Sequence, residues 1–134
     1  MNISQIFSNY GFSNLGSRHA IALCPNLSKP SLSKSVANNF KTLEIFYSKE
    51  TIRSIVSRKP KLLESNLDSW IEFLMHYGVP NKYIKKMLEH HTDIFIKSTI
   101  FELGRQMLEM KKSGITDFEI QHLYIPYHPH LFIK

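Results

Sequence analysis

The sequence predicts an all-α fold, an α-solenoid of about three and a half helix-pair repeats. Apolar residues recur at helical spacing along the chain, and no stretch has a convincing β-strand pattern. A helical stripe ends at a proline-type anchor at Pro25, Pro60 and Thr92, which lie 35 and 32 residues apart, and a short apolar segment follows each anchor. A fourth copy of this pattern precedes residues 128–132. Periods of this length are typical of stacked-repeat proteins.

The first half of the chain is expected to form four helices. Gly11 can end the first helix by adopting a left-handed conformation at little cost. Pro25 and Pro60 end the second and fourth, because the residue before a proline is pushed out of the helical region. Ser13 and Ser48 can cap the starts of the same two helices. The expected helices cover about residues 2–10, 14–24, 34–46 and 49–59.

The second half is expected to form four more helices. Gly78 and Gly114 end two of them, and Pro80 suits the first turn of a helix because its missing N–H costs nothing there. Thr99 and Thr116 each precede a glutamate by three residues, which is the spacing of a capping box. The expected helices cover about residues 67–77, 80–91, 100–113 and 117–124, and the segment 125–129 is expected to be too rich in proline to be helical throughout.

The second helix of each pair carries an expected buried stripe with a base beside it. Residues eight, five and four positions before the anchor share one helix face. They are Ser17, Ala20 and Ile21, then Ile52, Ile55 and Val56, then Ile84, Met87 and Leu88. Seven positions before the anchor stands a base every time: Arg18, Arg53 and Lys85. Stacked repeats would align these bases in a column, but ordinary solvated charge is also compatible with them, so both interpretations stay open.

The densest basic cluster of the chain surrounds Pro60. Two adjacent lysines, Lys85 and Lys86, lie in the third copy of the repeat. Lys111 and Lys112 lie at a helix end, where they complement the helix dipole without any ligand. The candidate nucleic-acid-binding residues are therefore Arg18, Arg53, Arg58, Lys59, Lys61, Lys85 and Lys86.

Length and composition limit the function classes. A chain of 134 residues corresponds to one domain, and its formal net charge of +6 favours nucleic acid or an acidic surface as a partner. The single cysteine excludes an internal disulfide and favours a reducing compartment. No apolar run approaches the ~20 residues that a membrane-spanning helix needs, so we expect no membrane span.

The first 43 residues contain four bases and no acid. Presequences that direct proteins to organelles are basic, rich in serine and poor in acids, so a presequence overlapping this region is an alternative interpretation. Against it, the region contains a copy of the repeat, and its first seventeen residues have no lysine or arginine.

Several segments resemble the mTERF repeat, named for mitochondrial transcription termination factors. That family pairs an apolar helix ending in a Phe-Leu…Gly-Val-type turn with a second helix closed by Pro-x-Leu-Leu. The segments Phe73–Pro80 and Arg58–Leu63 carry this resemblance, and Tyr10–Ser13 and Cys24–Leu27 fit the same pattern. The resemblance covers nearly the whole chain, as one mTERF-like domain over residues 1–134 with repeats at about 1–29, 30–63, 64–97 and 98–134.

The resemblance implies a curved solenoid of helix pairs, each with a short 3₁₀-helix, in a mitochondrial protein or alternatively a chloroplast one. It implies a positively charged groove for double-stranded DNA or structured RNA, ribosomal RNA included, and a role in transcription regulation, ribosome assembly or RNA processing. No catalytic residues come with the family. The chain departs from the pattern at Thr92, which replaces the proline, at Phe46, which replaces the turn glycine, and in the last repeat, which has one extra residue.

Other constellations of reactive residues are weak. His90 and His91 diverge by about 100° on a helix, so they share one metal ion with difficulty, and we expect no metal site. Cys24 and His19 are five residues apart, a poor spacing for a nucleophile and its base, and a packed thiol is the simpler interpretation. Trp70 lies on an apolar stripe and is expected in the core. We expect no cofactor and no enzymatic activity.

The two ends of the chain suggest partners of another kind. A solenoid needs polar caps at its ends, whereas this chain begins almost at once in repeat material and ends in Leu131, Phe132 and Ile133. Exposed apolar ends predict contact with protein partners. The alternative function is therefore a structural subunit of a larger organellar assembly, such as a mitochondrial ribosome. The chain would then be either a fragment of a longer protein or a small docked subunit.

Overall fold

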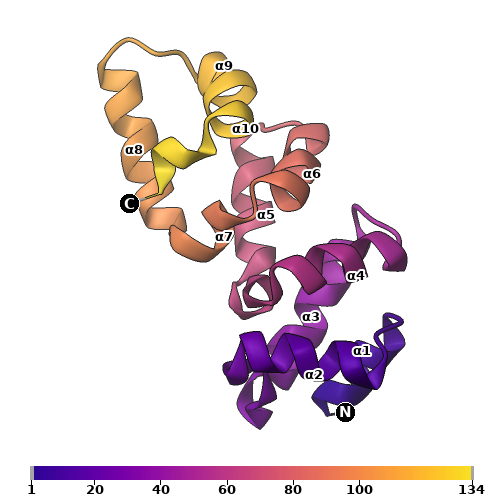
Figure 1. Cartoon of the computed structure of the whole chain (residues 1–134). Coiled ribbons are helices and arrows are strands. Elements are labelled where there is room, and N and C mark those ends of the chain that lie inside the picture. Colours follow the sequence, from indigo (N-terminus) through magenta and orange to yellow (C-terminus); the bar gives the residue numbers. More distant parts are fainter. Residues whose placement is uncertain (1, 134) are drawn as a thin grey trace. The chain divides into compact units, whose positions relative to one another are not determined.

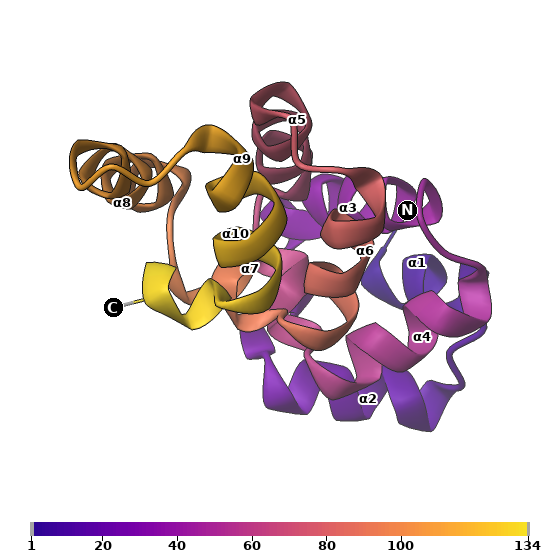
Figure 2. The same ribbon diagram turned by 90° about the horizontal axis from the view of Figure 1, so that it is seen from above.

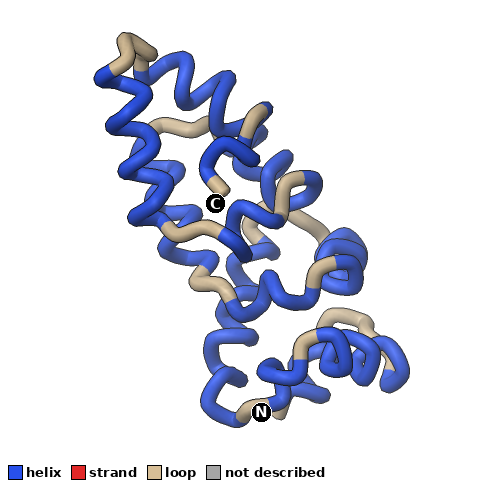
Figure 3. The backbone as a smooth tube through the Cα atoms, turned by 60° about the vertical axis from the view of Figure 1, so that its left-hand side comes forward, coloured by secondary structure: helices blue, strands red, loops and turns tan. Residues whose placement is uncertain are grey.

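A computed structural model describes residues 2–133, and over this range the chain is all-helical, as the sequence predicts. Figure 3 shows helices joined by short loops and no strand in the described residues. The chain divides into two compact units, one ending at Asp68 and the other beginning at Ser69. No helix among the described residues is long and apolar enough to cross a membrane.

The first unit contains two helix pairs, each closed by a 3₁₀-helix. The first pair comprises α1 (Ile3–Asn9), α2 (Asn14–Leu23) and the 3₁₀-helix η1 (Pro25–Ser28), and the second comprises α3 (Ser33–Glu44), α4 (Lys49–Arg58) and η3 (Pro60–Glu64), with the short η2 (Pro30–Leu32) between them. Equivalent elements pack on one another: α1 on α3, α2 on α4 and η1 on η3 (Figure 1). Two repeats are therefore stacked within this unit.

An aromatic cluster and one buried amide hold the first unit together. Phe40 of α3 is fully buried, and its ring stacks on Tyr10 at a centroid distance of 4.3 Å and meets Phe7 edge-on at 5.6 Å. The buried side chain of Asn39 donates to the carbonyl oxygens of Leu63 at 2.8 Å and Ser65 at 2.6 Å. These bonds attach α3 to η3 and to the residue that follows it.

The second unit has the same order of elements with local changes. Helix α5 (Leu67–Tyr77) begins at the boundary and is followed by α6 (Asn81–His90), α7 (Asp93–Lys97), α8 (Ile100–Lys112), α9 (Asp117–Glu119), the π-helix η4 (Ile120–Tyr124), α10 (Ile125–Tyr127) and the 3₁₀-helix η5 (Pro129–Phe132). Helix α6 packs on α10 and α7 packs on η5, and both views in Figures 1 and 2 place α6 beside α10. Trp70 is buried, as expected, and meets Phe95 edge-on at 5.3 Å.

Two expectations for the local structure were wrong. The segment after Thr92 is the α-helix α7 rather than a 3₁₀-helix. The last helix does not stop near Tyr124 but continues through Ile125 and Pro126 to Tyr127. The π-helical turn η4 precedes Pro126 and changes the hydrogen-bond register from i→i−4 to i→i−5 there, so the proline is accommodated.

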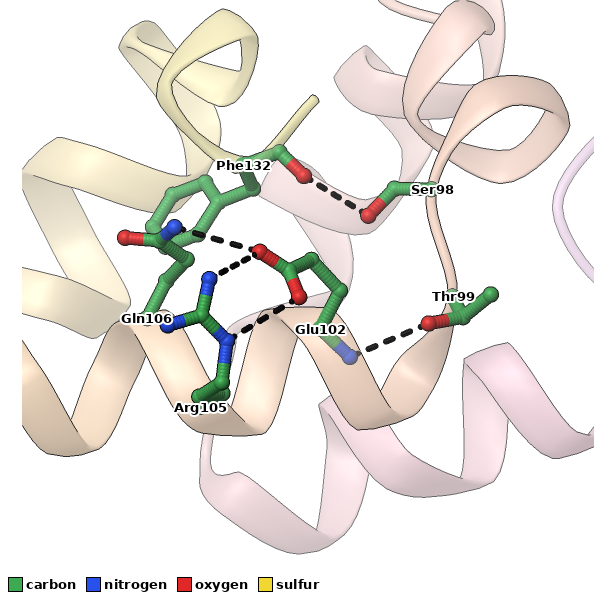
Figure 4. A network of polar contacts seen from close by, with 6 residues as sticks. All are labelled: Ser98, Thr99, Glu102, Arg105, Gln106 and Phe132. Carbon is green, nitrogen blue, oxygen red and sulfur yellow. Dashed lines mark hydrogen bonds and ion pairs between the residues drawn. The ribbon is translucent and has the colours of Figure 1, made fainter. Parts of the chain in front are cut away.

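The prediction of an exposed apolar end was also wrong for Phe132. Phe132 is only 1% exposed, and Ser98 donates a hydrogen bond to its carbonyl oxygen at 2.7 Å (Figure 4). In the same view Thr99 caps α8, and Glu102 accepts from Arg105 and Gln106. Leu131 is exposed and Ile133 is half-buried, so the residue that dominates this end packs inward.

Candidate nucleic-acid interface

In the first three predicted pairs, the second helix places a base beside a buried stripe. Helices α2, α4 and α6 each have ten residues and end at a C-cap whose N–H donates to the carbonyl four residues earlier. All stripe positions are buried except Ile21, which is half-buried. The bases lie one position after the first stripe residue, about 100° round the helix. Arg18 and Lys85 are exposed and Arg53 is half-buried.

Arg53 has a structural partner. Its Nη1 donates to the carbonyl oxygen of Gly11 at 3.2 Å, across the turn that joins α1 to α2. Gly11 has a φ of +83°, and a Cβ at this position would clash with the Arg53 guanidinium. The turn therefore favours a glycine through its positive φ, while the guanidinium, at the end of a flexible side chain, could move aside. A guanidinium has five N–H donors, so this one bond leaves donors that can reach a phosphate.

A cavity of about 370 Å³ opens beside Arg53 within the first unit. Gly11, Phe12, Ser13 and Gly16 line one side of it, and Glu50, Arg53, Ser54 and Ser57 of α4 line the other. Hydroxyl groups and a guanidinium can donate to phosphate oxygens, while Glu50 limits how far an anion can enter. This polar cavity marks where α4 faces the preceding helix pair.

A second hollow involves bases that sequence analysis did not select. Lys34 and Lys41, together with Ser35, Ala37 and Asn38, line a cavity of about 470 Å³ on the surface of α3. Both lysines are exposed, and their spacing of seven residues puts them on one helix face. That spacing, in a region without acids, was the signal that could have identified them.

The predicted basic cluster forms around the end of α4. Arg58, Lys59 and Lys61 are exposed, whereas Pro60 between them is buried. The charge of Lys61 acts on the buried Cys24 thiol at the end of α2. Burial and a hydrogen bond with Glu64 nevertheless raise the pKa of Cys24 to about 11, so the thiol is protonated at neutral pH and packs as a small apolar group.

The two candidate lysines of the second unit differ from each other. Lys85 is exposed on α6. The Nζ of Lys86 lies 3.7 Å from the ring centroid of Tyr127 in α10, which is close enough for a cation–π interaction. Lys86 thus helps to join α6 to α10. The structure brings Arg53 to the Gly11 turn and gathers the three bases at Pro60, and it pairs Lys86 with an aromatic ring.

The histidines of the second unit do not form a recognisable ligand set. Among the described residues, no three His, Cys, Asp or Glu side chains come together as a metal site would require. Burial, together with the charges of Lys86, His90 and His130, lowers the pKa of His91 below its ordinary value of 6.5. His90 lies near Glu89, with 3.9 Å between Nε2 and the carboxylate oxygen.

Charge is distributed unevenly between the two units. By sequence, the first has nine lysines and arginines against four acids, and the second has eight against seven. In the first unit, Arg53 and Lys49 bind neutral groups, the carbonyl oxygens of Gly11 and Asn9. In the second unit, four bases form ion pairs with acids: Lys97 with Asp93, Arg105 with Glu102, Lys111 with Asp117 and Lys112 with Glu109. The positive excess therefore belongs mainly to the first unit.

No protein-family model, curated protein or solved structure matches this chain. The resemblance to the mTERF repeat therefore remains a prediction from sequence.

Proposed function

We propose that this chain is a nucleic-acid-binding helical-repeat protein of organellar gene expression. It binds the phosphate backbone of double-stranded DNA or structured RNA through the bases of its first unit, with Lys85 as a further contact from the second. The observation that carries this proposal is the excess of bases in the first unit, all of them exposed except Arg53, with Arg18 and Arg53 at equivalent positions of the packed helices α2 and α4. Backbone contacts of this kind give affinity without reading sequence.

The proposal also covers the way in which the helix pairs stack. We propose that the four helix pairs form one mTERF-type solenoid. The packing of α2 on α4 within the first unit, and of α6 on α10 within the second, supports this, because both are contacts between equivalent second helices. The mitochondrial location, with the chloroplast as alternative, rests on the resemblance alone, as does the role in transcription or RNA processing.

The test is a salt titration of binding to duplex DNA, duplex RNA and structured ribosomal RNA. A variant with Arg18→Ala, Lys59→Ala and Lys61→Ala removes three exposed bases of the first unit. We expect weaker binding and a logarithmic salt slope reduced by about one per lost phosphate contact. Lys112→Ala is the matched control, because this lysine is exposed in the second unit and ion-paired with Glu109. Unchanged affinity and slope in the triple variant would refute the proposed interface.

A structural subunit of a larger assembly is the second candidate function. Two exposed apolar side chains on one side of α8 favour it: Phe101 is 80% exposed, and Leu108, seven residues later, is 54% exposed. Exposed side chains of this size commonly mark protein contacts when they gather on one face. A chain that binds none of the three nucleic acids and aggregates alone would favour this candidate over the first.

A further inference from the structure

Four aromatic side chains of the second unit contact one another in a row. The ring of Phe118 in α9 stacks on that of His122 in η4, with 4.0 Å between centroids and 18° between planes. His122 meets Tyr83 of α6 edge-on at 5.9 Å, and Tyr83 meets Tyr127 of α10 edge-on at the same distance. We call Phe118, His122, Tyr83 and Tyr127 the aromatic row. It joins the last helical segment to α6, which lies beside α10 (Figures 1 and 2).

The aromatic row is open to solvent, unlike the aromatic cluster of the first unit. Phe118 is 67% exposed and Tyr127 is 47% exposed, while Tyr83 and His122 are half-buried. Phe40, at the centre of the other cluster, is fully buried. Aromatic rings usually stabilise a fold by burying a large area. A group of rings that stays exposed on one surface is instead typical of an interaction site.

The stack of Phe118 on His122 leaves one ring face available. Residues four apart lie on the same side of a helix, and the Nδ1 of His122 also lies 3.0 Å from the carbonyl oxygen of Phe118. The imidazole is thus held against one face of the phenyl ring. Because the Phe118 side chain is nevertheless mostly exposed, its opposite face is open to solvent. A flat aromatic ligand placed there would continue the existing stack.

Two lysines of α6 stand beside the tyrosines of the row. The Nζ of Lys82 lies 5.0 Å from the ring centroid of Tyr83, and that of Lys86 lies 3.7 Å from the ring centroid of Tyr127. Cation–π contacts of this kind hold the ammonium groups at the row but leave their charge uncompensated. Within the described part of the chain, neither lysine forms an ion pair with an acid. Helix α6 contains three lysines and only one acid, Glu89.

The two acids beside Phe118 are engaged at the start of α9. Asp117 is ion-paired with Lys111 at 3.3 Å. Glu119 accepts hydrogen bonds from the backbone N–H and the hydroxyl of Thr116 in the capping box, at a helix start that favours negative charge. Anionic groups of a ligand are therefore favoured along the α6 side of the row and not at the start of α9.

Flat rings beside uncompensated cations match the chemistry of a single-stranded nucleic acid. Proteins that bind single strands stack bases on aromatic side chains and hold phosphates with bases. A duplex does not fit, because its base faces are stacked on one another. We propose that the aromatic row binds unpaired bases of single-stranded RNA or DNA. One base stacks on the open face of Phe118, and Lys82 and Lys86 contact phosphates.

The test titrates the full chain into labelled oligouridylate and oligothymidylate and follows fluorescence anisotropy. Both strands are expected to bind, and the lower Kd identifies the preferred sugar. Phe118→Ala should raise the Kd by about 5- to 150-fold, the value of one stacked base. It should leave the salt slope unchanged, because it removes no phosphate contact. Lys82→Ala should instead reduce the logarithmic salt slope by about 0.7 per lost contact.

Three further variants show whether the ring itself matters. Phe118→Trp keeps a flat ring and should bind as the wild type does. Phe118→Leu keeps an apolar side chain without a ring and should bind as weakly as Phe118→Ala. Phe101→Ala is the matched control, because this phenylalanine of α8 is 80% exposed and should leave the Kd unchanged. Circular dichroism checks that each variant is folded, which is expected because both side chains are exposed.

The inference is refuted if the chain binds neither single strand, or if Phe118→Ala binds them as tightly as the wild type. It does not rest on the proposed duplex interface, whose bases lie mainly in the first unit. Blunt duplex DNA titrated in parallel separates the two. Duplex binding together with single-strand binding that does not depend on Phe118 overturns only the aromatic row. Single-strand binding that depends on Phe118, without any duplex binding, overturns only the duplex interface.

Discussion

The helices α3 and α8 hold the same place in their units but have different surroundings. Phe40 of α3 lies six residues before the turn residue Phe46, and Leu108 of α8 lies six residues before Gly114. Phe40 is fully buried beneath Tyr10 and Phe7 of the preceding helix and turn. Leu108 is 54% exposed on α8, a helix that lies at the edge of its unit (Figures 1 and 2). A repeat position therefore does not fix burial by itself. The neighbour that covers the helix decides it.

The largest expected effect tests this difference directly. Phe40→Ala should destabilise the protein by about 3–5 kcal/mol, because it opens a cavity in the aromatic cluster. Leu108→Ala should change the free energy of unfolding by no more than about 0.5 kcal/mol, because the side chain is half in solvent. Chemical denaturation measures the free energy of unfolding of both variants. Equal losses in the free energy of unfolding would mean that another molecule covers Leu108 in solution.

A smaller effect is expected one position earlier in the same helices. Asn39 of the first unit and Met107 of the second both lie seven residues before the turn, but only Asn39 holds buried backbone groups. Asn39→Ala should cost about 2–3 kcal/mol, because the carbonyls of Leu63 and Ser65 lose their donor. Met107→Leu preserves apolar volume and should cost less than about 1.5 kcal/mol. Thermal and denaturant unfolding would measure both losses of stability, and a larger loss for Met107→Leu would contradict this expectation.

The smallest effect concerns a tyrosine that both units place before a turn glycine. Tyr10 donates to Glu44 at 3.1 Å, and burial and this hydrogen bond raise the pKa of Tyr10 from 10.0 to about 12. Its contribution is therefore complete below pH 10 and is lost as the pH rises through about 12. Tyr10→Phe should cost about 0.5–1.5 kcal/mol at neutral pH. It should also remove this part of the alkaline loss, which denaturation curves between pH 9 and pH 12 would reveal.

Tyr77 provides the matched position in the second unit. Its hydroxyl donates to Asp117 at 2.7 Å, and burial together with this bond raises its pKa. The same bond lowers the pKa of Asp117, with Lys111 contributing in the same direction. Tyr77→Phe should therefore also remove part of the loss of stability at alkaline pH, as Tyr10→Phe does. An alkaline loss that neither substitution changes would contradict both assignments.

Sequence patterns predicted the stripes well because burial on a helix follows from spacing. The apolar residues of α5, Leu67, Trp70, Ile71 and Leu74, are all buried as expected. The end of the chain was predicted less well, because Phe132 is in the core through contacts that no local pattern encodes. The charged candidate residues were predicted only in part. Spacing placed Arg53 beside its stripe, but its bond to Gly11 depends on a turn 42 residues earlier.

The π-helical turn in the last helix has a consequence for how this chain accommodates length. The segment Asp117–Tyr127 has eleven helical residues where α2, α4 and α6 have ten. In a regular α-helix the extra residue would rotate everything after it by about 100°. A π-helical turn can hold such an extra residue, and His128 then ends the helix with φ −131° and ψ 47°, close to the −130° and 46° of His91. The longer helix therefore ends in the same local backbone conformation as the regular one.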